Sequence, residues 1–479
     1  MSADPYLSDI AEHYIGGSWM KGGAVADSAN PATDEVLGSY YDADLETAQS
    51  AISAARSAFD GQSWGKDRDI RAKVLWQLAD AVEAHHDELV TALTLENGKL
   101  RHEAEFEFSL TAPKLRYYAG LTLTDSGSAS ETRPGVVSML LKEPVGVAGI
   151  IVPWNAPVIL AIRSLAPALA AGCTAVVKMP AQTALTNNLL ARVLAEATEL
   201  PAGVVNIFTE SGDAGARELV SSAQVDVISY TGSSAVGALI MAAAAPQLKR
   251  VSLELGGKTP MIVFNDADLD VVVPTLTAAL STSAGQICFT GSRILAETGI
   301  AAELRSRLAA SFEQLKPGPA SDPSSQIGPM ISHDSVARVD AIIEGAEGAE
   351  VIVRGGLVDG PGSFYRPALL GVSDLNSPLI QNEIFGPVAI FETFGSEEEA
   401  ADRANATGYG LAASIWTADG GRSLRMSAAV QAGTVWTNTW GQLPDQYEDG
   451  GYKKSGLGRL SGLGGLAEFQ EVKHVLRMS

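Results

Sequence analysis

The segment from Val147 to Leu255 constrains the fold most, because runs rich in β-branched residues alternate there with longer stretches of helical spacing. The runs predict strands at Val147–Val152, Thr174–Met179, Val204–Phe208, Val225–Tyr230 and Arg250–Leu255. The stretches between them predict helices at Val158–Ala170, Leu185–Thr198, Ala214–Ser222 and Ala235–Ala245. This order predicts an α/β fold with a parallel sheet covered by helices on both faces. Ligands of such sheets bind beyond the carboxyl ends of the strands, so we expect functional residues in the loops there.

A second alternating region follows the first. It predicts strands at Thr259–Phe264, Ser292–Ala296, Val351–Arg354 and Val388–Phe394, with helices at Asp268–Ser281, Ile300–Leu315 and Glu397–Ala406. Gly355–Pro367 is predicted to be a loop. The first ~120 residues are predicted to be mostly helical, with charged outer faces on Asp44–Ala58 and Lys66–Gly98, and Glu131–Lys142 is predicted to be an extended arm. We expect three parts: a Rossmann-like domain of residues 1–122 and 143–255, a catalytic domain of residues 256–433, and a bridging element of residues 123–142 and 434–479.

Charge and cysteine content exclude several classes of function. The 479 residues include 34 Lys and Arg against 56 Asp and Glu, a net charge of −22. A phosphate-reading or anionic-membrane surface needs the opposite balance, so we expect no nucleic-acid or membrane partner. The two cysteines, Cys173 and Cys288, exclude a disulfide framework and a cysteine-rich metal cluster, and no metal site is expected.

No targeting signal is recognised in the sequence. Met1–Ile10 lacks the basic start and apolar stretch of a signal peptide. Val145–Ile162 is uncharged over a length that can suggest a membrane span, but Pro153, Asn155 and Pro157 interrupt it. We therefore expect a cytoplasmic protein.

Two loops that follow predicted strands have the composition of ligand-binding turns. In Pro153–Pro157, Asn155 is either an amide donor for an oxyanion or an ordinary helix N-cap. In Tyr230–Gly237, Gly232 and Ser233 open a helix whose N-terminus favours a pyrophosphate, although an ordinary turn has the same composition. A G-x-G-x-x-G fingerprint is absent from the turn at Glu210–Gly215. The glycines near Gly456 are interpreted as a turn of the second domain.

Three further motifs contain groups that suit catalysis or nucleotide binding. Glu254 ends an apolar strand, where desolvation would raise its pKa toward that of a general base, although most such glutamates face solvent. Cys288 lies in a glycine-containing loop, whereas Cys173 has the surroundings of a core residue. Glu383, on a turn with Phe385, can accept both hydroxyls of a ribose or be a simple surface residue.

The order and spacing of these motifs resemble the NAD(P)-dependent aldehyde dehydrogenase superfamily. Leu253–Lys258 is similar to its glutamate motif, Gly285–Cys288 to its cysteine motif, Glu383–Pro387 to its E-x-F-G-P motif and Gly450–Gly456 to its C-terminal glycine motif. The resemblance extends from about Tyr14 to the C-terminus. It implies oxidation of an aldehyde to a carboxylic acid with NAD or NADP, by an enzyme that forms a homodimer or homotetramer.

The resemblance also implies roles for individual residues. Cys288 would be the nucleophile, Asn155 an oxyanion donor and Glu254 the base that activates water. Lys178 is expected both among the catalytic residues and among the residues that bind the cofactor. The expected cofactor-binding residues are Val152, Pro153, Trp154, Lys178, Ala181, Gly212, Thr231, Gly232, Ser233, Leu255, Glu383 and Phe385. The expected substrate-contacting residues are Arg163, Ile287, Phe289, Leu443 and Asp449.

Departures from the family pattern leave the cofactor preference and the substrate open. Ala181 stands where NAD-preferring members often have Glu, which suggests tolerance of NADP, and Glu210 replaces a usual glycine. Arg163 stands where relatives acting on carboxylate-bearing semialdehydes, such as succinic semialdehyde, also have Arg. However, Glu448 and Asp449 replace a usual Pro and aromatic residue, and an acidic partner would neutralise Arg163.

The sequence fits three other classes of protein less well. A cysteine hydrolase would need a histidine base, and none of the six His lies in a recognisable strand-end motif. A CoA-acylating relative would lack Glu254, and a non-enzymatic homologue would have lost Cys288.

Overall fold

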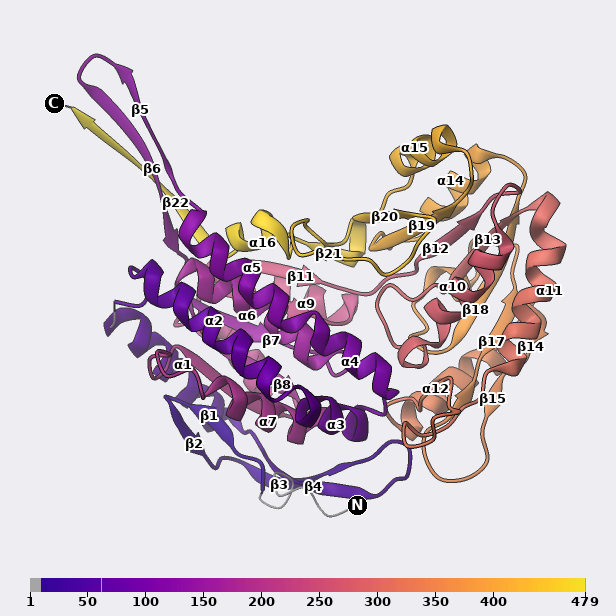
Figure 1. Cartoon of the computed structure of the whole chain (residues 1–479), viewed down its shortest axis with the longest axis horizontal. Helices are drawn as coiled ribbons and strands as arrows, with labels where there is room; N and C mark the ends of the chain where they lie inside the picture. The colour runs from indigo at the N-terminus through magenta and orange to yellow at the C-terminus, as the bar shows by residue number, and fades with distance from the viewer. Residues whose placement is uncertain (1–9, 62, 479) are drawn as a thin grey trace.

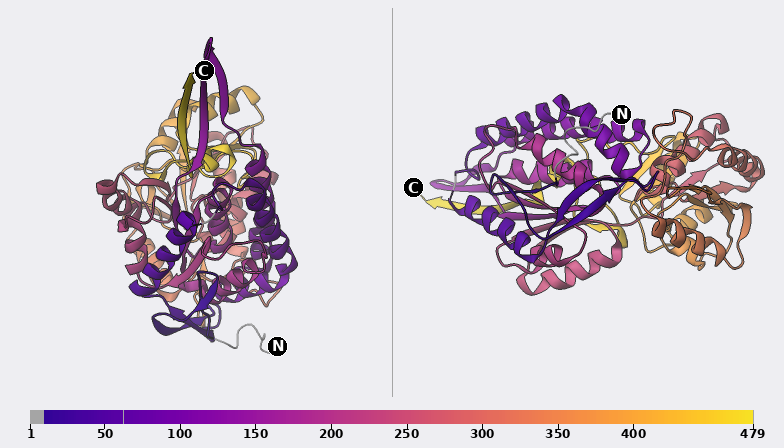
Figure 2. Two further views of the ribbon diagram at one scale, coloured as in Figure 1. Left: turned by 90° about the vertical axis from the view of Figure 1, so that its left-hand side faces the viewer. Right: turned by 90° about the horizontal axis from the view of Figure 1, so that it is seen from below.

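The computed structural model describes residues 10–61 and 63–478. Two large sheets, each packed with helices, lie side by side, and a narrow arm projects from the first of them (Figure 1). The C-terminus lies at the tip of this arm in both Figure 1 and Figure 2. The segment tested for a signal peptide, Met1–Ile10, lies outside the described residues except for Ile10.

The first sheet contains the five predicted strands, all parallel, as expected for the Rossmann-like part. Its strand order is β2-β1-β9-β8-β7-β10-β11-β21. The parallel strands are β7 (Val147–Ile151), β8 (Thr174–Pro180), β9 (Val205–Glu210), β10 (Val227–Thr231) and β11 (Arg250–Glu254). Antiparallel strands extend both edges: β1 (His13–Ile15) and β2 (Ser18–Met20) beyond β9, and β21 (Gly456–Leu457) beyond β11.

Helices cover both faces of this sheet because its residues alternate between two apolar cores. Ala148, Ile150 and Val177 pack on one side, whereas Val147 and Val176 pack on the other. The first core contains α6 (Pro157–Ala171) and α7 (Ala184–Leu194) under an outer layer of α2 (Arg68–Ala84), α3 (His86–Asn97), α4 (Arg101–Ser109) and α5 (Thr111–Thr124). The second core contains α1 (Leu45–Gly61), α8 (Ala214–Ser221) and α9 (Ser234–Ala244).

The N-terminal region differs from its helical prediction in two respects. Residues 13–42 form β1, β2, β3 (Ala24–Ala29) and β4 (Val36–Asp42), because these short segments gain hydrogen bonds from strand pairing that helical spacing does not reveal. The predicted helix Lys66–Gly98 is two helices, since His85 leaves helical geometry with φ −103° and ψ 18°. Asp67 caps α2 by accepting a hydrogen bond from the amide of Ile70 at 3.0 Å.

The second sheet has the order β14-β17-β18-β13-β12-β19-β20 and is parallel except at β14. The sequence predicted β12 (Pro260–Val263), β13 (Arg293–Glu297), β14 (Glu350–Val353) and β18 (Val388–Phe394), together with α10 (Leu269–Ser281), α11 (Thr298–Gln314) and α14 (Glu397–Asn405). It did not identify β17 (Ala368–Gly371), β19 (Ala412–Trp416), β20 (Thr434–Thr437), α12 (His333–Glu344), α13 (Pro378–Gln381) or α15 (Gly420–Ala429). The predicted loop Gly355–Pro367 contains the short pair β15 (Gly356–Leu357) and β16 (Tyr365–Arg366).

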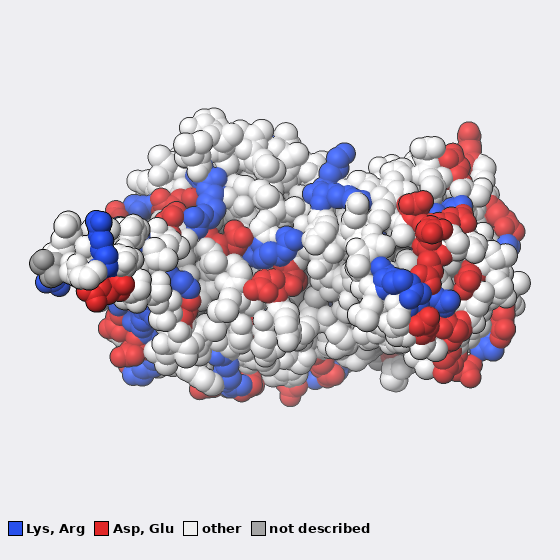
Figure 3. Space-filling view, turned by 90° about the horizontal axis from the view of Figure 1, so that it is seen from above, with Lys and Arg blue, Asp and Glu red and all other residues white. Residues whose placement is uncertain are grey.

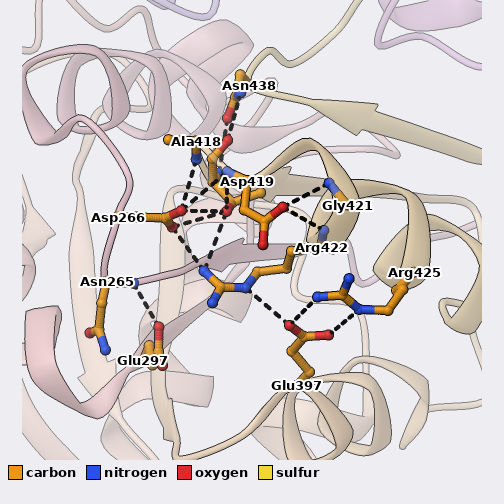
Figure 4. A network of polar contacts seen from close by, with 11 residues as sticks. Asn265, Asp266, Glu297, Glu397, Ala418, Asp419, Gly421, Arg422, Arg425 and Asn438 are labelled. Atoms are coloured by element: carbon orange, nitrogen blue, oxygen red, sulfur yellow. Dashed lines mark hydrogen bonds and ion pairs between the residues drawn. The ribbon is translucent and has the colours of Figure 1, made fainter.

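A polar network ties α14 and α15 to the end of β12 (Figure 4). Asp266 accepts hydrogen bonds from the guanidinium of Arg422 and from the Thr417 hydroxyl. Glu397 accepts from Arg422 and Arg425, and these two cations lower its pKa to about 2. The network holds the outer helices of the second sheet in place.

The arm is the three-stranded sheet β22-β6-β5. It consists of β5 (Ser128–Arg133), β6 (Val136–Pro144) and β22 (Gln470–Met478). The predicted extended segment, Glu131–Lys142, lies in β5 and β6. Residues 434–479, expected to form one bridging element, are distributed over three sheets, since β20, β21 and β22 each pair with a different sheet. The turn at Gly456 therefore does not belong to the second domain: β21 pairs with Leu253 and Glu254 at the edge of β11.

Charged side chains of both signs are interspersed on the face seen in Figure 3. Within the described residues, we find no helix with the length and hydropathy that a membrane span requires.

Candidate active site

Cys288 lies in the loop after η4 (Thr282–Gly285), a 3-10 turn with unusual backbone geometry. Ser283, Ala284 and Gly285 have φ of 49°, 52° and 71°, in the left-handed region that costs non-glycine residues free energy. The amide of Ser283 donates to the Glu103 carboxylate at 2.8 Å, and Glu103 is buried on α4. A glutamate from the helical layer thus holds the strained turn that presents Cys288.

Asn155 is joined directly to the cysteine loop. Its Nδ2 donates a hydrogen bond to the backbone oxygen of Gln286 at 3.0 Å, two residues before Cys288. The N-cap of α6 is Ala156, so Asn155 is not the helix cap that was its alternative interpretation. Because a carboxamide has two N–H groups, one remains to donate to an oxygen developing near Cys288.

Glu254 ends β11 and is buried with 5 % of its surface exposed. Its Oε1 has no hydrogen-bond partner among the described residues. Burial raises the pKa of Glu254 to about 8; Arg163 and Arg459 lower it and Asp449 raises it. Glu254 is therefore a buried carboxyl group and not the solvent-facing glutamate of the alternative interpretation.

Gly256 and Gly257 bring the glutamate, cysteine and E-x-F-G-P motifs together. A Cβ on Gly256 would lie 2.3 Å from Glu383 Oε2, and a Cβ on Gly257 would lie 2.3 Å from the backbone oxygen of Cys288. The Gly257 amide also donates to Glu383 Oε1 at 3.1 Å. Only glycine allows these approaches, so the spacing of the motifs in sequence has a direct structural reason.

Two of the predicted cofactor-binding loops meet through aromatic rings. The rings of Trp154 and Phe385 pack edge to face with centroids 5.7 Å apart. Burial raises the pKa of Glu383, beside Phe385, to about 7. Trp154 follows a strand of the first sheet and Phe385 precedes a strand of the second, so this contact lies at the junction of the two sheets.

The residues predicted to bind the pyrophosphate and the adenosine lie at the ends of β8, β9 and β10. Ser233 is the N-cap of α9 and accepts from the amide of Val236 at 3.3 Å. A Cβ on Gly232 would lie 2.2 Å from the Tyr230 hydroxyl, and Leu255 packs closely on Gly237 of α9. Lys178 is on β8, where burial lowers its pKa and the charge of Glu210 is the largest effect that raises it. A helix N-terminus and a lysine are both groups that bind phosphate oxygens, so these residue types fit the predicted phosphate side.

The remaining predicted cofactor-binding residues are placed around these two sides. The amide of Val152 bonds to the oxygen of Lys178 at 3.0 Å, Pro153 precedes Trp154, and Ala181 begins η2 (Ala181–Thr183) directly after β8. Gly212 lies in the turn before α8, whose N-terminal amides Gly215 and Ala216 donate to the buried Glu210 carboxylate. Glu210, which replaces a glycine, thus acts as a cap for α8.

Arg163 is paired inside the protein. Its Nη1 lies 3.1 Å from Asp449 Oδ2, and its Nη2 donates to the Thr231 hydroxyl at 3.0 Å. Both Arg163 and Asp449 are at least nine-tenths buried. Arg163, which could bind a substrate anion, is therefore in contact with Asp449, the acidic partner that would neutralise it.

Two tryptophan rings pack against Phe289, one of the other predicted substrate residues. Phe289 lies 5.9 Å from Trp436 and 5.6 Å from Trp440, measured between ring centroids. Trp436 Nε1 donates to the oxygen of Gln442, next to Leu443. Ile287 and Cys288 are half-buried in the same loop as Phe289. The sequence did not single out the two tryptophans, because they lie on short strands and loops without a recognisable motif.

The sequence also missed glutamates that it assigned to outer helix faces or did not discuss. Glu107 accepts from the amides of Val158 and Ile159, at the start of the helix after Asn155, and pairs with Lys99. Glu96 similarly accepts from Leu185 and Thr186 at the start of α7. Glu96 and Glu107 are almost completely buried, so Glu96 does not belong to the charged outer face predicted for Lys66–Gly98.

Cys173 is fully buried beneath α6, and burial raises its pKa to about 11, in agreement with its interpretation as a core residue. Among residues 10–61 and 63–478, no group of His, Cys, Asp and Glu has a metal-binding arrangement.

Comparison with known proteins identifies the family. Residues 19–475 match the Aldehyde dehydrogenase family. The chain belongs to this family. Over 97 % of its length it is 38 % identical to (Z)-2-((N-methylformamido)methylene)-5-hydroxybutyrolactone dehydrogenase of Acinetobacter baylyi and 37 % identical to betaine aldehyde dehydrogenase of Bacillus subtilis, covering 96 % of each.

Solved structures agree with this assignment. Betaine aldehyde dehydrogenase of Staphylococcus aureus in complex with NAD+ superposes with a TM-score of 0.96 at 33 % identity, covering 99 % of this chain and 96 % of that one. An NAD-dependent aldehyde dehydrogenase of Sinorhizobium meliloti superposes with a TM-score of 0.96 at 34 % identity, over 100 % and 97 % of the two chains. The protein is thus an NAD(P)-dependent aldehyde dehydrogenase with the expected fold. This assignment replaces the alternative of a non-enzymatic homologue.

Proposed function

We propose that this aldehyde dehydrogenase converts an aldehyde to a carboxylic acid through Cys288, Asn155 and Glu254. The observation that supports this most is the contact of Gly256 and Gly257 with Glu383 on one side and Cys288 on the other. It supports the proposal because Glu254, Cys288 and Glu383 all lie close to this short segment.

The chemistry follows from these positions. The Cys288 thiolate adds to the aldehyde carbon, and the oxyanion of the thiohemiacetal accepts hydrogen bonds from Asn155 Nδ2 and the Cys288 amide. A bound nicotinamide cofactor would supply the acceptor for the hydride that leaves the thiohemiacetal carbon, and that carbon would then remain on Cys288 as a thioester. Glu254 takes a proton from water as the water oxygen attacks the thioester, and the acid and the free thiolate are released.

The cofactor site has the residues that a dinucleotide needs. Lys178, Ser233 and the N-terminus of α9 would hold the ribose hydroxyls and the pyrophosphate, and Glu383 the nicotinamide ribose. Ala181 leaves space and no charge for a 2′-phosphate, whereas Glu210, Asp42 and Asp213 place negative charge opposite Lys178. We propose that NAD is used and NADP tolerated, with Glu210 limiting that tolerance.

The substrate class follows from the Arg163–Asp449 pair and the rings around Phe289. Since Asp449 already neutralises Arg163, and three aromatic rings lie beside the cysteine loop, we propose an aldehyde without a carboxylate. A carboxylate-bearing semialdehyde is the second candidate, because Arg163 Nε is buried without a partner among the described residues. A similar enzyme, from Danio rerio and 37 % identical, is named 2-aminomuconic semialdehyde dehydrogenase.

The enzyme's location and assembly are also proposals. We propose a cytoplasmic enzyme that assembles as a homodimer or homotetramer through its arm. The arm's exposed Leu140, Leu141, Val472 and Leu476 support this assembly, because a projecting sheet edge with apolar side chains favours pairing between copies.

The experiment is the absorbance change at 340 nm with NAD or NADP and a panel of aldehydes. We expect reduction of the cofactor by the wild type and none by Cys288→Ala. Reduction at the wild-type rate in Cys288→Ala would exclude the mechanism. In the same panel Arg163→Leu should change KM equally for anionic and neutral aldehydes; a selective rise for anionic ones would favour the semialdehyde reaction.

A further inference from the structure

Arg163 connects the two residues that flank Glu254. Thr231, which accepts from Arg163 Nη2, is the register partner of Glu254 on the adjacent strand β10. Asp449, paired with Arg163 Nη1, precedes Gly450, where a Cβ would lie 2.9 Å from Glu254 Oε1. The guanidinium is therefore anchored on both sides of the proposed base.

Arg163, Asp449 and Glu254 each have a buried polar atom without a hydrogen-bond partner among the described residues. Arg163 Nε, Asp449 Oδ1 and Glu254 Oε1 are all buried and make no hydrogen bond within the part of the chain described. Because Glu254 Oε1 accepts no direct hydrogen bond from that part, burial and the nearby charges together determine whether its carboxyl group is ionised.

Those charges act on Glu254 and Cys288 in the same way. Burial raises the pKa of both groups, and Arg163 exerts the largest charge effect on each by lowering it. Asp449 opposes Arg163 at both positions; Arg459 also faces Glu254, and Glu383 and Glu254 face Cys288. Burial lowers the pKa of Arg163 itself, but Asp449, Glu254 and Cys288 outweigh this and raise it, so Arg163 stays charged.

We propose that Arg163 and Asp449 are opposed positioning residues that set the pH range in which Cys288 and Glu254 work. Arg163 favours the thiolate and the carboxylate, and Asp449 limits that effect while it orients the guanidinium. The proposal rests on the proposed function, in which Cys288 attacks as a thiolate and Glu254 accepts a proton as a carboxylate. It assigns Arg163 to the chemistry itself rather than to recognition of a substrate anion.

The two residues have opposite expected effects, which separates this role from a purely structural one. In Arg163→Gln, loss of the cation should move the acidic limb of the kcat–pH profile to higher pH, since Glu254 then ionises later. In Asp449→Asn, the negative charge that opposes Arg163 is lost, so Glu254 should ionise earlier and the acidic limb of the profile should move to lower pH. Arg163→Lys retains the charge and should restore most of the wild-type profile, whereas a structural role would make all three changes act in the same direction.

A measurement that does not need turnover tests the same point. The rate of Cys288 alkylation by iodoacetamide between pH 7 and pH 10 reports the thiolate fraction, and fully buried Cys173 is an internal reference in the mass spectrum. We expect alkylation roughly tenfold slower in Arg163→Gln and several-fold faster in Asp449→Asn, because one pKa unit changes the thiolate fraction about tenfold. Arg250→Gln, which removes a charge paired with Glu471 away from this site, is the matched control and should leave the rate unchanged.

The results distinguish failure of this proposal from failure of the proposed function. Shifts in the same direction for Arg163→Gln and Asp449→Asn, or unchanged alkylation in both, would overturn the role of the pair. Should one variant not fold, the sign of the shift in the other still decides. A wild type that reduces no cofactor with any aldehyde would overturn the proposed function, and opposite shifts in alkylation would still support the electrostatic pair.

Discussion

Asn155 Nδ2 donates a hydrogen bond to the backbone oxygen of Gln286 at 3.0 Å, which connects the loop after β7 to the loop of Cys288 across the two sheets. One N–H of the same amide orients the donor and the other is available to an oxyanion. Asn155→Ala should therefore lower kcat by roughly 10²–10³-fold, the usual effect of removing one oxyanion donor. Steady-state kinetics at saturating aldehyde and cofactor would show it, and a loss below threefold would exclude this role.

Gly257 offers a second test, because its Cα lies against the oxygen of Cys288. The Cβ of Gly257→Ala would approach that oxygen to 2.3 Å and displace the cysteine loop. We expect a loss of kcat/KM of at least about 100-fold, or about 2.7 kcal/mol of transition-state stabilisation. Gly120→Ala on α5 is the control, since a Cβ there meets nothing within 4 Å. Equal activity of the two variants would show that this approach is not required.

The cofactor preference depends on two residues with opposite expected effects. Glu210→Gln should shift the ratio of kcat/KM for NAD and NADP toward NADP, because Lys178 then faces less negative charge. Ala181→Glu should shift it toward NAD, because a carboxylate there repels a 2′-phosphate. We expect the wild type to prefer NAD by less than about 100-fold, or 2.7 kcal/mol. A larger preference would reject tolerance of NADP, and shifts of the same sign would reject the role of Glu210.

The second sheet contains a buried ion pair on which stability should depend. Arg293 Nε and Nη2 lie 2.7 and 2.9 Å from the two Glu392 oxygens, and both side chains are fully buried. Glu392→Ala leaves a buried guanidinium without its carboxylate and should lower the free energy of unfolding by about 3–5 kcal/mol. Urea unfolding followed by circular dichroism measures this, with Glu313→Ala, at an exposed position of α11, as the control. A change below 1 kcal/mol would contradict the expected role of the pair.

The parts predicted best from the sequence were those with a repeated local pattern. The strands of the parallel sheet extend over most of their predicted residues because each is a short run rich in apolar and β-branched residues and is buried on both faces. The short strands β1 to β4 escaped prediction because three to seven residues with mixed burial have no clear period and are held by pairing with distant segments.

The site residues divide in a similar way. Asn155, Glu254, Cys288 and Glu383 were proposed from local motifs. Gly256 and Gly257, just after Glu254, contact Glu383 and Cys288, and Asn155 is joined to the cysteine loop by its hydrogen bond to Gln286. Glu103 and Glu107 could not be recognised, because a glutamate that accepts backbone amides from a distant loop has the same local sequence as one on a solvated helix face. The contact of Arg163 with Asp449 joins residues 286 positions apart, which no local pattern encodes.

The central claim is that Cys288 holds an acyl group which Glu254 releases by activating water. Rapid mixing of Glu254→Gln with aldehyde and NAD should give a burst of about one NADH per active site followed by a near-complete stop. Mass spectrometry of the quenched protein should then find the acyl group on the peptide containing Cys288. Continued turnover at the wild-type rate, or a burst without an adduct on Cys288, would contradict the account.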